Sequence, residues 1–309
     1  MDVSFIIPTL NEEHEITHTL NAIRESVAHI SHEIIVVDNG SDDQTTEMAK
    51  EIADLVIVEP TKTVGGLRNV GASYAKGRIL VFNDADVRLT KQWAQKFSSC
   101  MVQYLEESDV VGGALAVPES PYLIHKYWFK PLLRNKESKV VNYVGTGNMI
   151  VRKDLFLECK GFDERLETGE DYDFCVRMKK NGARILYDSD LEAIHIGYPH
   201  DLKSFVRREF WHGKGDFQSL SNLFTSKTAL FSLLFVLTNI TFIVSLFLEN
   251  YYFSYLILFV AGILLLYFSL HKTPSKIGVY GRAVHMGLSF LYLWARGLSF
   301  WGNLKLLKL

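Results

Sequence analysis

The stretch GGLRNVGASYAKGRILVFNDAD, residues 65–86, combines a predicted helix, a predicted strand and two carboxylates. The helix is expected at residues 65–76 and the apolar strand at residues 79–82, after which Asp84 and Asp86 stand one residue apart. In an extended chain, side chains at positions i and i+2 leave the same face, so both carboxylates should point the same way. Like charges so placed repel each other unless water or a cation screens them. A solvated loop and a cation site are therefore the two interpretations of this pair.

The segments before this stretch alternate between strands and helices. Strands are expected at residues 3–8, 33–37 and 55–58, with helices at residues 16–27 and 44–53. This alternation predicts a mostly parallel α/β sheet with helices on both faces. In such sheets ligands bind outside the carboxyl ends of the strands. Asp38 follows the second strand, so we expect it to lie at the same edge as Asp84 and Asp86.

Composition limits the class of protein. The chain has 309 residues, 48% of them hydrophobic and 22% charged, with a formal net charge of −2. This is enough apolar mass for an α/β core and a further region, and the near-neutral charge gives no electrostatic argument for a nucleic-acid partner. Cys100, Cys159 and Cys175 are widely spaced, which suits a reducing compartment and argues against a disulfide framework or a zinc site. The opening MDVSFIIPTL has no basic region or cleavage signal and is expected to be the first strand.

Two later segments are long and uncharged. Residues 228–248 and 251–270 each span about twenty positions, the length that crosses roughly 30 Å of hydrocarbon. Lys and Arg flank this pair but are absent from the two-residue link Glu249-Asn250, so both ends are expected on the cytoplasmic side. We predict a transmembrane hairpin here, the alternative being two buried helices of a soluble core.

A third apolar segment, residues 283–301, is interrupted by His285 and Arg296. These polar residues favour a helix that lies in the membrane interface over a third crossing. We therefore predict a soluble domain at residues 1–224 and a membrane region at residues 225–309. The protein is expected to be a multi-pass membrane protein whose soluble domain faces the cytoplasm.

Four segments, in order, resemble motifs of glycosyltransferase family 2, whose members have the Rossmann-like GT-A fold. They are SFIIPTLNEE (4–13), VVDNGSDDQT (36–45), the stretch 65–86, and GTGNMIVRKDLFLECKGFDERLETGEDYDFCVRMKKNGARI (145–185). Two positions depart from the family pattern: Asn39 replaces the usual second Asp, and Leu67 stands where Ala is usual. The resemblance implies that residues 1–224 form a GT-A glycosyltransferase domain.

By this resemblance, the first two motifs bind the nucleotide of the donor. Asp38 would hydrogen-bond the base, and Pro8, Asn11 and Glu12 would line the same pocket. An Asp acceptor suits the N3–H of uracil, although guanine and thymine also offer ring N–H donors. From the residues alone, Asp38 and the Asn-Gly-Ser that follows are also typical of a capped turn. Arg68 lies in the first turn of a helix whose N-terminus favours anions, and it would add positive charge.

The resemblance also assigns the paired carboxylates to a metal. Asp86 would be the principal ligand, and Asp84 would lie near the ribose or a metal-bound water. A divalent cation stabilises a departing diphosphate as a Lewis acid, and oxygen ligands favour Mg²⁺ or Mn²⁺. His195, in LEAIHIG, resembles a histidine that some relatives place beside the metal; an ordinary core or loop histidine is the alternative.

Glu170-Asp171 corresponds to the family's Glu-Asp pair, in which Asp171 would be the general base that accepts a proton from an acceptor hydroxyl. The same residues also match a capping box that begins at Thr168, so Asp171 could instead cap a helix. A helix terminus would keep the pKa of Asp171 low. The resemblance further implies inversion at the anomeric centre.

Further residues are expected on the acceptor or diphosphate side. They are Gly147, Asn148, Arg207, Arg208 and Trp211. Arg207-Arg208-Glu-Phe-Trp211 only faintly resembles the QxxRW box of processive synthases, because the Gln and the Arg before Trp are missing. This difference favours an enzyme that adds a single sugar.

The leading hypothesis is an inverting, Mn²⁺- or Mg²⁺-dependent glycosyltransferase. It would move a sugar from a nucleotide-diphosphate sugar, preferably a UDP-sugar, to a hydroxyl of a lipid-linked saccharide at the membrane. One alternative is transfer to polyprenyl phosphate, whose ionised oxygen needs no base. Another is a membrane protein that binds nucleotide sugars without catalysis.

Overall fold

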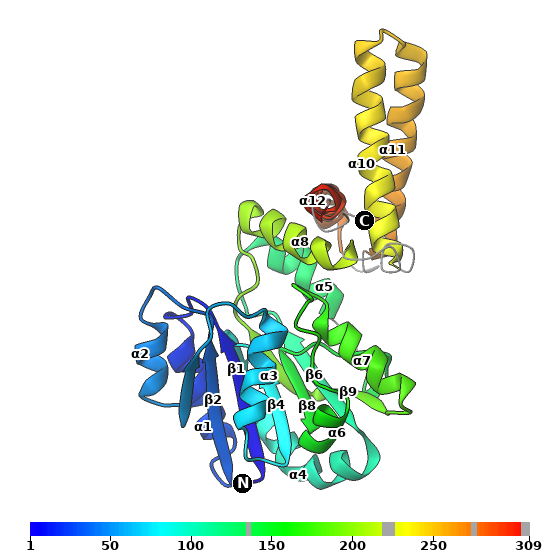
Figure 1. Ribbon diagram of the computed structural model, residues 1–309. Helices are drawn as coiled ribbons and strands as arrows, with labels where there is room; N and C mark the ends of the chain where they lie inside the picture. Colours follow the sequence, from blue (N-terminus) through cyan, green and yellow to red (C-terminus); the bar gives the residue numbers. More distant parts are fainter. Residues whose placement is uncertain (134–136, 218–225, 273–276, 304–309) are drawn as a thin grey trace. The chain divides into compact units, whose positions relative to one another are not determined.

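The computed structural model describes residues 1–133, 137–217, 226–272 and 277–303 (Figure 1). Its sheet has nine strands in the order β3-β2-β1-β4-β8-β6-β9-β5, with β7 paired to β9. The strands are β1 (Val3–Thr9), β2 (His32–Asp38), β3 (Leu55–Val58), β4 (Ile79–Asn83), β5 (Val87–Leu89), β6 (Val110–Ala116), β7 (Lys139–Val140), β8 (Asn148–Arg152) and β9 (Ile185–His195). The four strands predicted from the sequence are β1 to β4, and each agrees within one residue at either end.

The first part of the sheet is parallel, as the alternation of strands and helices predicts. β1 pairs in parallel with β2 and β4, and β2 pairs in parallel with β3. Beyond β4 the sheet is mixed, because β8 runs antiparallel to both β4 and β6. The α/β fold is confirmed, and the antiparallel strands are the part that the sequence pattern did not indicate.

Helices cover both faces of the sheet, and adjacent residues of a strand contribute to different cores. The helices of this part are α1 (Ile16–Ser26), α2 (Thr45–Lys50), α3 (Val64–Tyr74), α4 (Lys91–Glu107), α6 (Lys153–Glu158) and α7 (Glu170–Lys180). Phe5 packs into one core with Trp93 of α4. Ile6, the next residue of β1, belongs to the other core with Phe156 of α6 and Phe174 of α7. A strand buried on both faces is continuously apolar, which explains the run FII in β1.

The carboxyl ends of the parallel strands bring polar residues to one edge of the sheet. Thr9, Asp38 and Asn83 end β1, β2 and β4. The antiparallel strand β8 begins at that edge, because its first residue, Asn148, is in register with Asn83. This edge therefore collects the residues that follow the strands, including Asp84 and Asp86.

The chain forms two compact units. The first contains Met1–Pro118 and Asn135–Gly197, and the second contains Glu119–Arg134 and Tyr198–Leu309. The predicted boundary between residues 224 and 225 lies outside the described residues. The second unit comprises a π-helix (His125–Phe129), α5 (Lys130–Leu133), α8 (Leu202–Asp216), α10 (Lys227–Phe247), α11 (Tyr251–Lys272) and α12 (Val279–Asn303).

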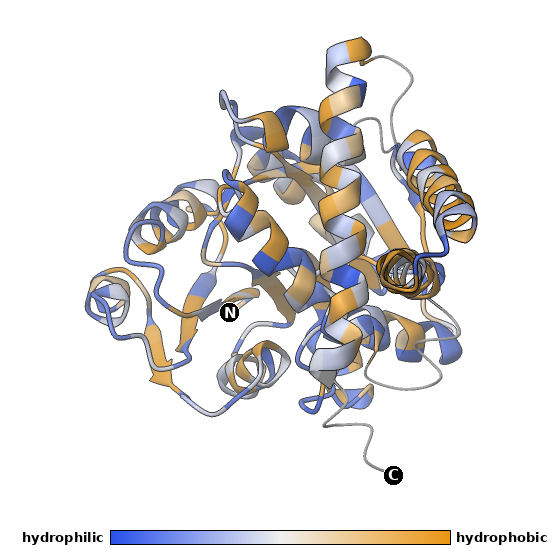
Figure 2. Ribbon diagram, turned by 90° about the horizontal axis from the view of Figure 1, so that it is seen from above, coloured by the Kyte–Doolittle hydropathy of each residue, from blue (hydrophilic) through white to orange (hydrophobic). Residues whose placement is uncertain are grey.

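Two helices in the described part of the chain, α10 and α11, are long and apolar enough to cross a membrane. Only 28% and 22% of their most apolar windows are buried within the protein, so they differ from the core helices of a soluble domain. Hydrophobic residues predominate in their ribbons in Figure 2, which looks nearly along the two helices. Three residues, 248–250, join them, and the tight connection is as expected for a hairpin.

The third apolar segment forms α12, and its polar interruptions make contacts within the second unit. Arg296 forms ion pairs with Glu209 (3.1 Å) and Asp216 (2.8 Å), both in α8. His285 is fully buried, and its ring stacks on Trp128 at 5.1 Å between centroids. These two side chains hold α12 against its neighbours in the protein, so they do not by themselves decide whether the helix lies in a membrane interface.

Candidate active site

Asp86 and His195, two predicted metal ligands, lie side by side. β5 pairs antiparallel with β9, and Val87 is in register with His195. This pairing brings the turn between β4 and β5 against the end of β9, where His195 Nε2 lies 3.1 Å from Asp86 Oδ2. The His195 side chain is 16% exposed and the Asp86 side chain is 18% exposed, so both are accessible at the carboxyl edge.

Glu12 adds a further carboxyl group near this pair. Burial is the main cause that raises the pKa of Glu12 to about 7, and the negative charge of Asp86 is the next, with a contribution from Asp84. Part of the raised pKa thus reflects repulsion between the Glu12 carboxylate and the neighbouring carboxylates of Asp86 and Asp84. A divalent cation bound to these oxygens would relieve this repulsion.

These residues fit a metal that shares its coordination sphere with a substrate. In the described part of the chain, no three His, Cys, Asp or Glu side chains are grouped to hold a metal ion on their own. Mg²⁺ is usually bound by one or two carboxylates, together with waters and substrate phosphates. Asp86, with His195 beside it, meets that requirement for Mg²⁺ or Mn²⁺.

Gly197 also lies at the metal-binding corner, the name used here for Asp86 and His195 together. The sequence did not predict a role for this glycine, and its place two residues after His195 is the only signal. A methyl group added to Gly197 would overlap the Asp86 carboxylate and would lie 3.5 Å from His195 Nε2. Any side chain at this position must therefore displace Asp86. Gly197 is needed for close approach.

Arg68 joins two carboxylates from different parts of the chain. It is 2% exposed and donates to Asp84 Oδ1 and to Glu170 Oε1, each at 2.7 Å. Thr63 caps the helix that carries it, α3, by accepting a hydrogen bond from Gly66 N. We predicted a positive charge available to the nucleotide, but these two carboxylates already neutralise Arg68. Its role is to position Asp84 and Glu170.

The same contacts show how Glu170 is held next to Asp171. Its carboxylate is bound to Arg68, and the residue is only 6% exposed. Glu170 also packs against Gly65, where an added Cβ would lie 3.3 Å from the Glu170 side chain. These contacts favour a positioning role for Glu170, and its predicted catalytic role stays a prediction.

Asp171 is half-buried in the first turn of α7. The residue before the helix is Gly169, with φ 84°, which has no side chain to cap it, so the capping-box interpretation is wrong. Asp171 Oδ1 instead accepts a hydrogen bond from the adjacent Tyr172 N at 2.7 Å. Burial, followed by the charge of Glu170, raises the pKa of Asp171 to about 6, whereas we expected the helix terminus to lower it.

Asp38 has no acceptor capacity left for a nucleotide base. It is fully buried, and its Oδ1 accepts from Gly40 N (2.9 Å) and Ser41 N (2.8 Å). Its Oδ2 accepts from Thr9 Oγ1 (3.0 Å) and Ser41 Oγ (2.5 Å). Four donors fill the sites of one carboxylate. In this structure Asp38 builds the turn after β2, and its contact with a base, which would require Thr9 or Ser41 to release the carboxylate, stays a prediction.

Pro8 and Asn11 also shape this end of the sheet. Pro8 is buried inside β1, beyond Ile6, the last residue that pairs with β4. Asn11 is exposed, with φ 56°, and its Oδ1 accepts from Asp42 N at 3.0 Å. The hydrogen bond of Asn11 joins the loops after β1 and β2 into one rim, and the predicted nucleotide contacts of Pro8 and Asn11 stay predictions.

Gly147 and Asn148 have different surroundings. A Cβ on Gly147 would lie 2.8 Å from Asp84 Oδ2, so this glycine lets the chain pass close to the acidic pair. Asn148 is 1% exposed, accepts from Trp93 Nε1 (2.9 Å) and donates to the Leu191 carbonyl (2.8 Å). The amide of Asn148 is thus used within the core, and its predicted role on the acceptor or diphosphate side stays a prediction.

Arg207, Arg208 and Trp211 lie on α8, in the second unit. Arg207 is exposed, and Trp211 is 40% exposed. Arg208 forms an ion pair with Glu209 at 2.7 Å and stacks over the Phe129 ring at 5.1 Å. Their roles at the membrane or near a diphosphate stay predictions.

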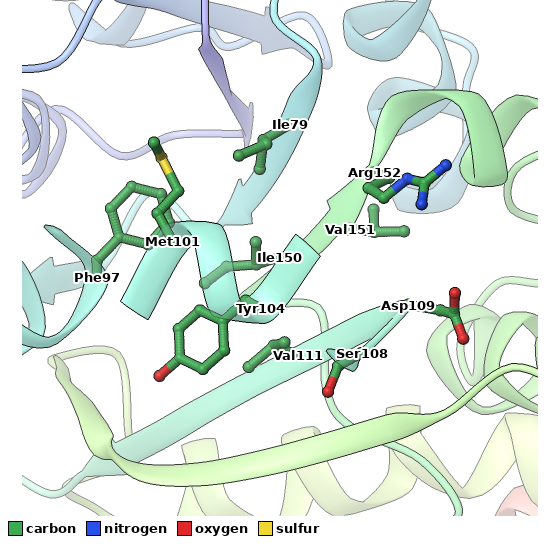
Figure 3. A pocket seen from close by; sticks show the side chains of 10 residues that line it. All are labelled: Ile79, Phe97, Met101, Tyr104, Ser108, Asp109, Val111, Ile150, Val151 and Arg152. Atoms are coloured by element: carbon green, nitrogen blue, oxygen red, sulfur yellow. The ribbon is translucent and has the colours of Figure 1, made fainter. Parts of the chain in front are cut away.

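A small cavity lies at the other edge of the sheet (Figure 3). It is lined by Ile79, at the start of β4, and by residues of α4, β6 and β8, including Met101, Val111 and Arg152. Its volume is about 10 Å³, close to the minimum for one water molecule. It is too small for a sugar or a nucleotide. The carboxyl edge is the candidate active site because Asp84, Asp86, His195 and Asp171 lie along it.

Comparison with protein families agrees with this geometry. Residues 4–159 match the model of glycosyl transferase family 2, and residues 125–295 match that of glycosyl transferase family group 2. The chain belongs to glycosyltransferase family 2. As a family 2 glycosyltransferase it is an enzyme, and the matched region includes Asp84 and Asp86.

Its relatives differ in how much of the chain they share. Glycosyltransferase AglE of Haloferax volcanii is 28% identical over 226 residues, which cover 70% of this chain and 73% of AglE. The Escherichia coli enzyme UDP-Glc:alpha-D-GlcNAc-diphosphoundecaprenol beta-1,3-glucosyltransferase WfgD is 33% identical over 88 residues, or 27% of this chain and 34% of WfgD.

Solved structures show the same fold at low sequence identity. S. aureus TarS 1–349 in complex with UDP-GlcNAc has a TM-score of 0.53 and 19% identity, covering 99% of this chain and 92% of TarS 1–349. GalNAc-T7 with UDP, GalNAc and Mn²⁺ has a TM-score of 0.53 and 16% identity, covering 71% of this chain and 50% of GalNAc-T7. GT-A proteins with this fold thus include one that binds Mn²⁺.

We expect Gly197→Ala to weaken use of the metal, because the added methyl group displaces the Asp86 carboxylate. The half-saturating Mn²⁺ concentration should rise by about 10–100-fold, the usual effect of disturbing the support of a metal ligand. Activity measured against Mn²⁺ concentration tests this. Gly287→Ala is the matched control, since nothing lies within 4 Å of an added Cβ there. An unchanged Mn²⁺ dependence for Gly197→Ala would contradict the assignment of Asp86.

We expect Asp171→Asn to lower kcat by about 10²–10⁴, because the amide cannot accept a proton. The base acts in its deprotonated form, and its pKa is raised from 3.8 to about 6. Wild-type kcat should therefore fall as the pH drops below about 6, and the residual activity of the variant should lack this dependence. A loss of only a few-fold, with an unchanged pH profile, would show that Asp171 is not the base.

Proposed function

We propose that this family 2 enzyme is an inverting, divalent-metal-dependent transferase that uses a nucleotide-diphosphate sugar, with a UDP-sugar as the favoured donor. The observation that supports it best is the chain of contacts along the carboxyl edge. Asp86 lies beside His195. Asp84, which directly follows β4, is bound to Arg68, and Arg68 also binds Glu170, the neighbour of Asp171 in the chain. A metal-binding corner and a raised-pKa carboxylate thus belong to one connected site.

Each residue of this site has a defined part in the proposed reaction. Asp86 and His195 would hold the cation, which when bound supplies Lewis-acid stabilisation for the departing diphosphate. The acceptor oxygen forms a bond to the anomeric carbon while the bond from that carbon to the diphosphate oxygen breaks. Asp171 takes the proton that the acceptor hydroxyl loses. Attack from the face opposite the diphosphate inverts the anomeric centre.

The raised pKa of Asp171 favours a hydroxyl acceptor. A carboxylate with a pKa of about 6 binds the transferred proton more tightly than an ordinary Asp does. Transfer to polyprenyl phosphate would not need this group, because the attacking oxygen is already ionised. The acceptor named for WfgD is a lipid-linked sugar, and α10 and α11 would hold this enzyme at the membrane that carries such a lipid.

A donor screen tests this function. The purified full chain is incubated with UDP-, GDP- and dTDP-sugars, and released nucleotide is measured with Mn²⁺, Mg²⁺ or excess EDTA. We expect release from one donor class, loss in EDTA, and loss in Asp86→Ala with the protein still folded. Full activity in EDTA would refute the metal dependence. No release from any of these donors in the presence of acceptor lipid extracts would refute the proposed donor class.

We also propose that the catalytic unit and α12 share the cytoplasmic side. Two crossing helices return the chain to the side it left, and the basic flanks favour the cytoplasm. Single cysteines are introduced at Glu47, Asn250 and Val279 after replacement of the native cysteines, and intact cells are treated with an impermeant reagent. Asn250→Cys alone should be labelled. Labelling of Val279→Cys from outside would contradict the hairpin.

A further inference from the structure

The chain between β7 and β8 passes close to both Asp84 and Asp171. Val144 and Thr146 are buried at 5% exposure each, while Tyr143 is 54% exposed. Gly147 lies against Asp84, and an added Cβ on Gly145 would find only Asp171 Oδ2 within 4 Å, at 3.6 Å. Gly147 and Gly145 therefore place this segment beside Asp84 and Asp171 in turn, with the exposed Tyr143 two residues before Gly145.

The ring of Tyr143 packs against the ring of Tyr172. Its ring centroid lies 5.4 Å from that of Tyr172 with an angle of 75° between the rings, which is an edge-to-face pair. Tyr172 is also 54% exposed, and it directly follows Asp171 in α7. Isolated exposed aromatics are common on protein surfaces. Here two large rings are held together beside the predicted base.

The space in front of Asp171 is kept open by Gly145. The backbone of Gly145 lies outside the left-handed region, so no conformational strain requires a glycine there. Packing does not require it either, because the only atom near an added Cβ is the Asp171 carboxylate oxygen, at ordinary contact distance. What the glycine provides is an open approach to the carboxylate.

We propose that Tyr143 and Tyr172 bind a saccharide ring of the acceptor, which presents its hydroxyl to Asp171 across Gly145. This rests on the function proposed above. A pyranose ring has an apolar C–H face and a polar rim, and tyrosine offers a rigid apolar ring with a hydroxyl at its end. The adjacent Asp171 carboxylate disfavours a phosphate at this point, so the ligand is the sugar part of the acceptor.

The test separates the acceptor side from the donor side. Full-length Tyr143→Ala, Tyr172→Ala and Gly145→Leu are compared with wild type, with Tyr143→Phe as the conservative variant. Tyr74→Ala is the matched control, since Tyr74 is 57% exposed at the end of α3. Two measurements are made on each: calorimetric binding of UDP, GDP and dTDP with Mn²⁺, and saturation-transfer NMR with octyl glycosides of glucose, galactose and N-acetylglucosamine. Transfer kinetics follow for any glycoside that is used.

We expect the two Tyr→Ala variants to bind the glycosides at least tenfold more weakly, with an equal rise in KM where transfer occurs. Gly145→Leu should lose transfer, and Tyr143→Phe should stay within a few-fold of wild type. Nucleotide binding should be unchanged in all of them, which also shows that they are folded. The proposal is overturned if no glycoside binds wild type, or if the variants bind glycosides as wild type does. An equal loss of nucleotide binding would also overturn it, by showing a structural role. Failure of wild type to bind any nucleotide would refute the proposed function itself.

Discussion

The buried guanidinium of Arg68 is the contact on which the arrangement of the site depends. It donates to Asp84, in the turn after β4, and to Glu170, at the start of α7. A charged group so buried is tolerated only when it is paired, and loss of one partner typically costs about 3–5 kcal/mol. The three charges therefore hold α3, the β4–β5 turn and α7 in one arrangement. As a result, Asp84 and Asp171 belong to the same sheet edge.

The surroundings of Asp171 show why this arrangement matters for chemistry. A helix N-terminus stabilises a carboxylate by about 0.3–1 kcal/mol, which is less than one pKa unit. The shift from 3.8 to about 6 is larger and has the opposite sign. Burial and the neighbouring Glu170 charge outweigh the helix, and Arg68 is already shared between Asp84 and Glu170. The pairing that positions the site thus also leaves Asp171 basic enough to accept a proton.

In the second unit, ion pairs also hold helices together. Arg296 stands in an apolar segment, where the sequence suggests a polar face turned to water. The structure instead pairs it with Glu209 and Asp216 of α8, and Glu209 also binds Arg208. This network fastens α12 to the helix that carries Arg207 and Trp211. The exposed apolar surface of the unit is left mainly to α10 and α11.

The sequence by itself determined the features that depend on local pattern. These are the strands β1 to β4, the carboxylates that follow β4, the apolar hairpin helices and the family motifs. Local pattern is sufficient there because strand and helix periodicity and span length are written in neighbouring residues. Asp86 and Asp171 were placed at the site on the same basis, through motifs.

Only the tertiary structure decided how the polar side chains are used. Asp38 and Asn148 belong to matching motifs, yet their hydrogen bonds are completed within the protein by Thr9, Trp93 and Leu191. Gly197 matters because it meets Asp86, which is more than a hundred residues away in the chain. A side chain's free lone pairs, burial and pKa depend on partners distant in sequence, and periodicity carries no information about those partners.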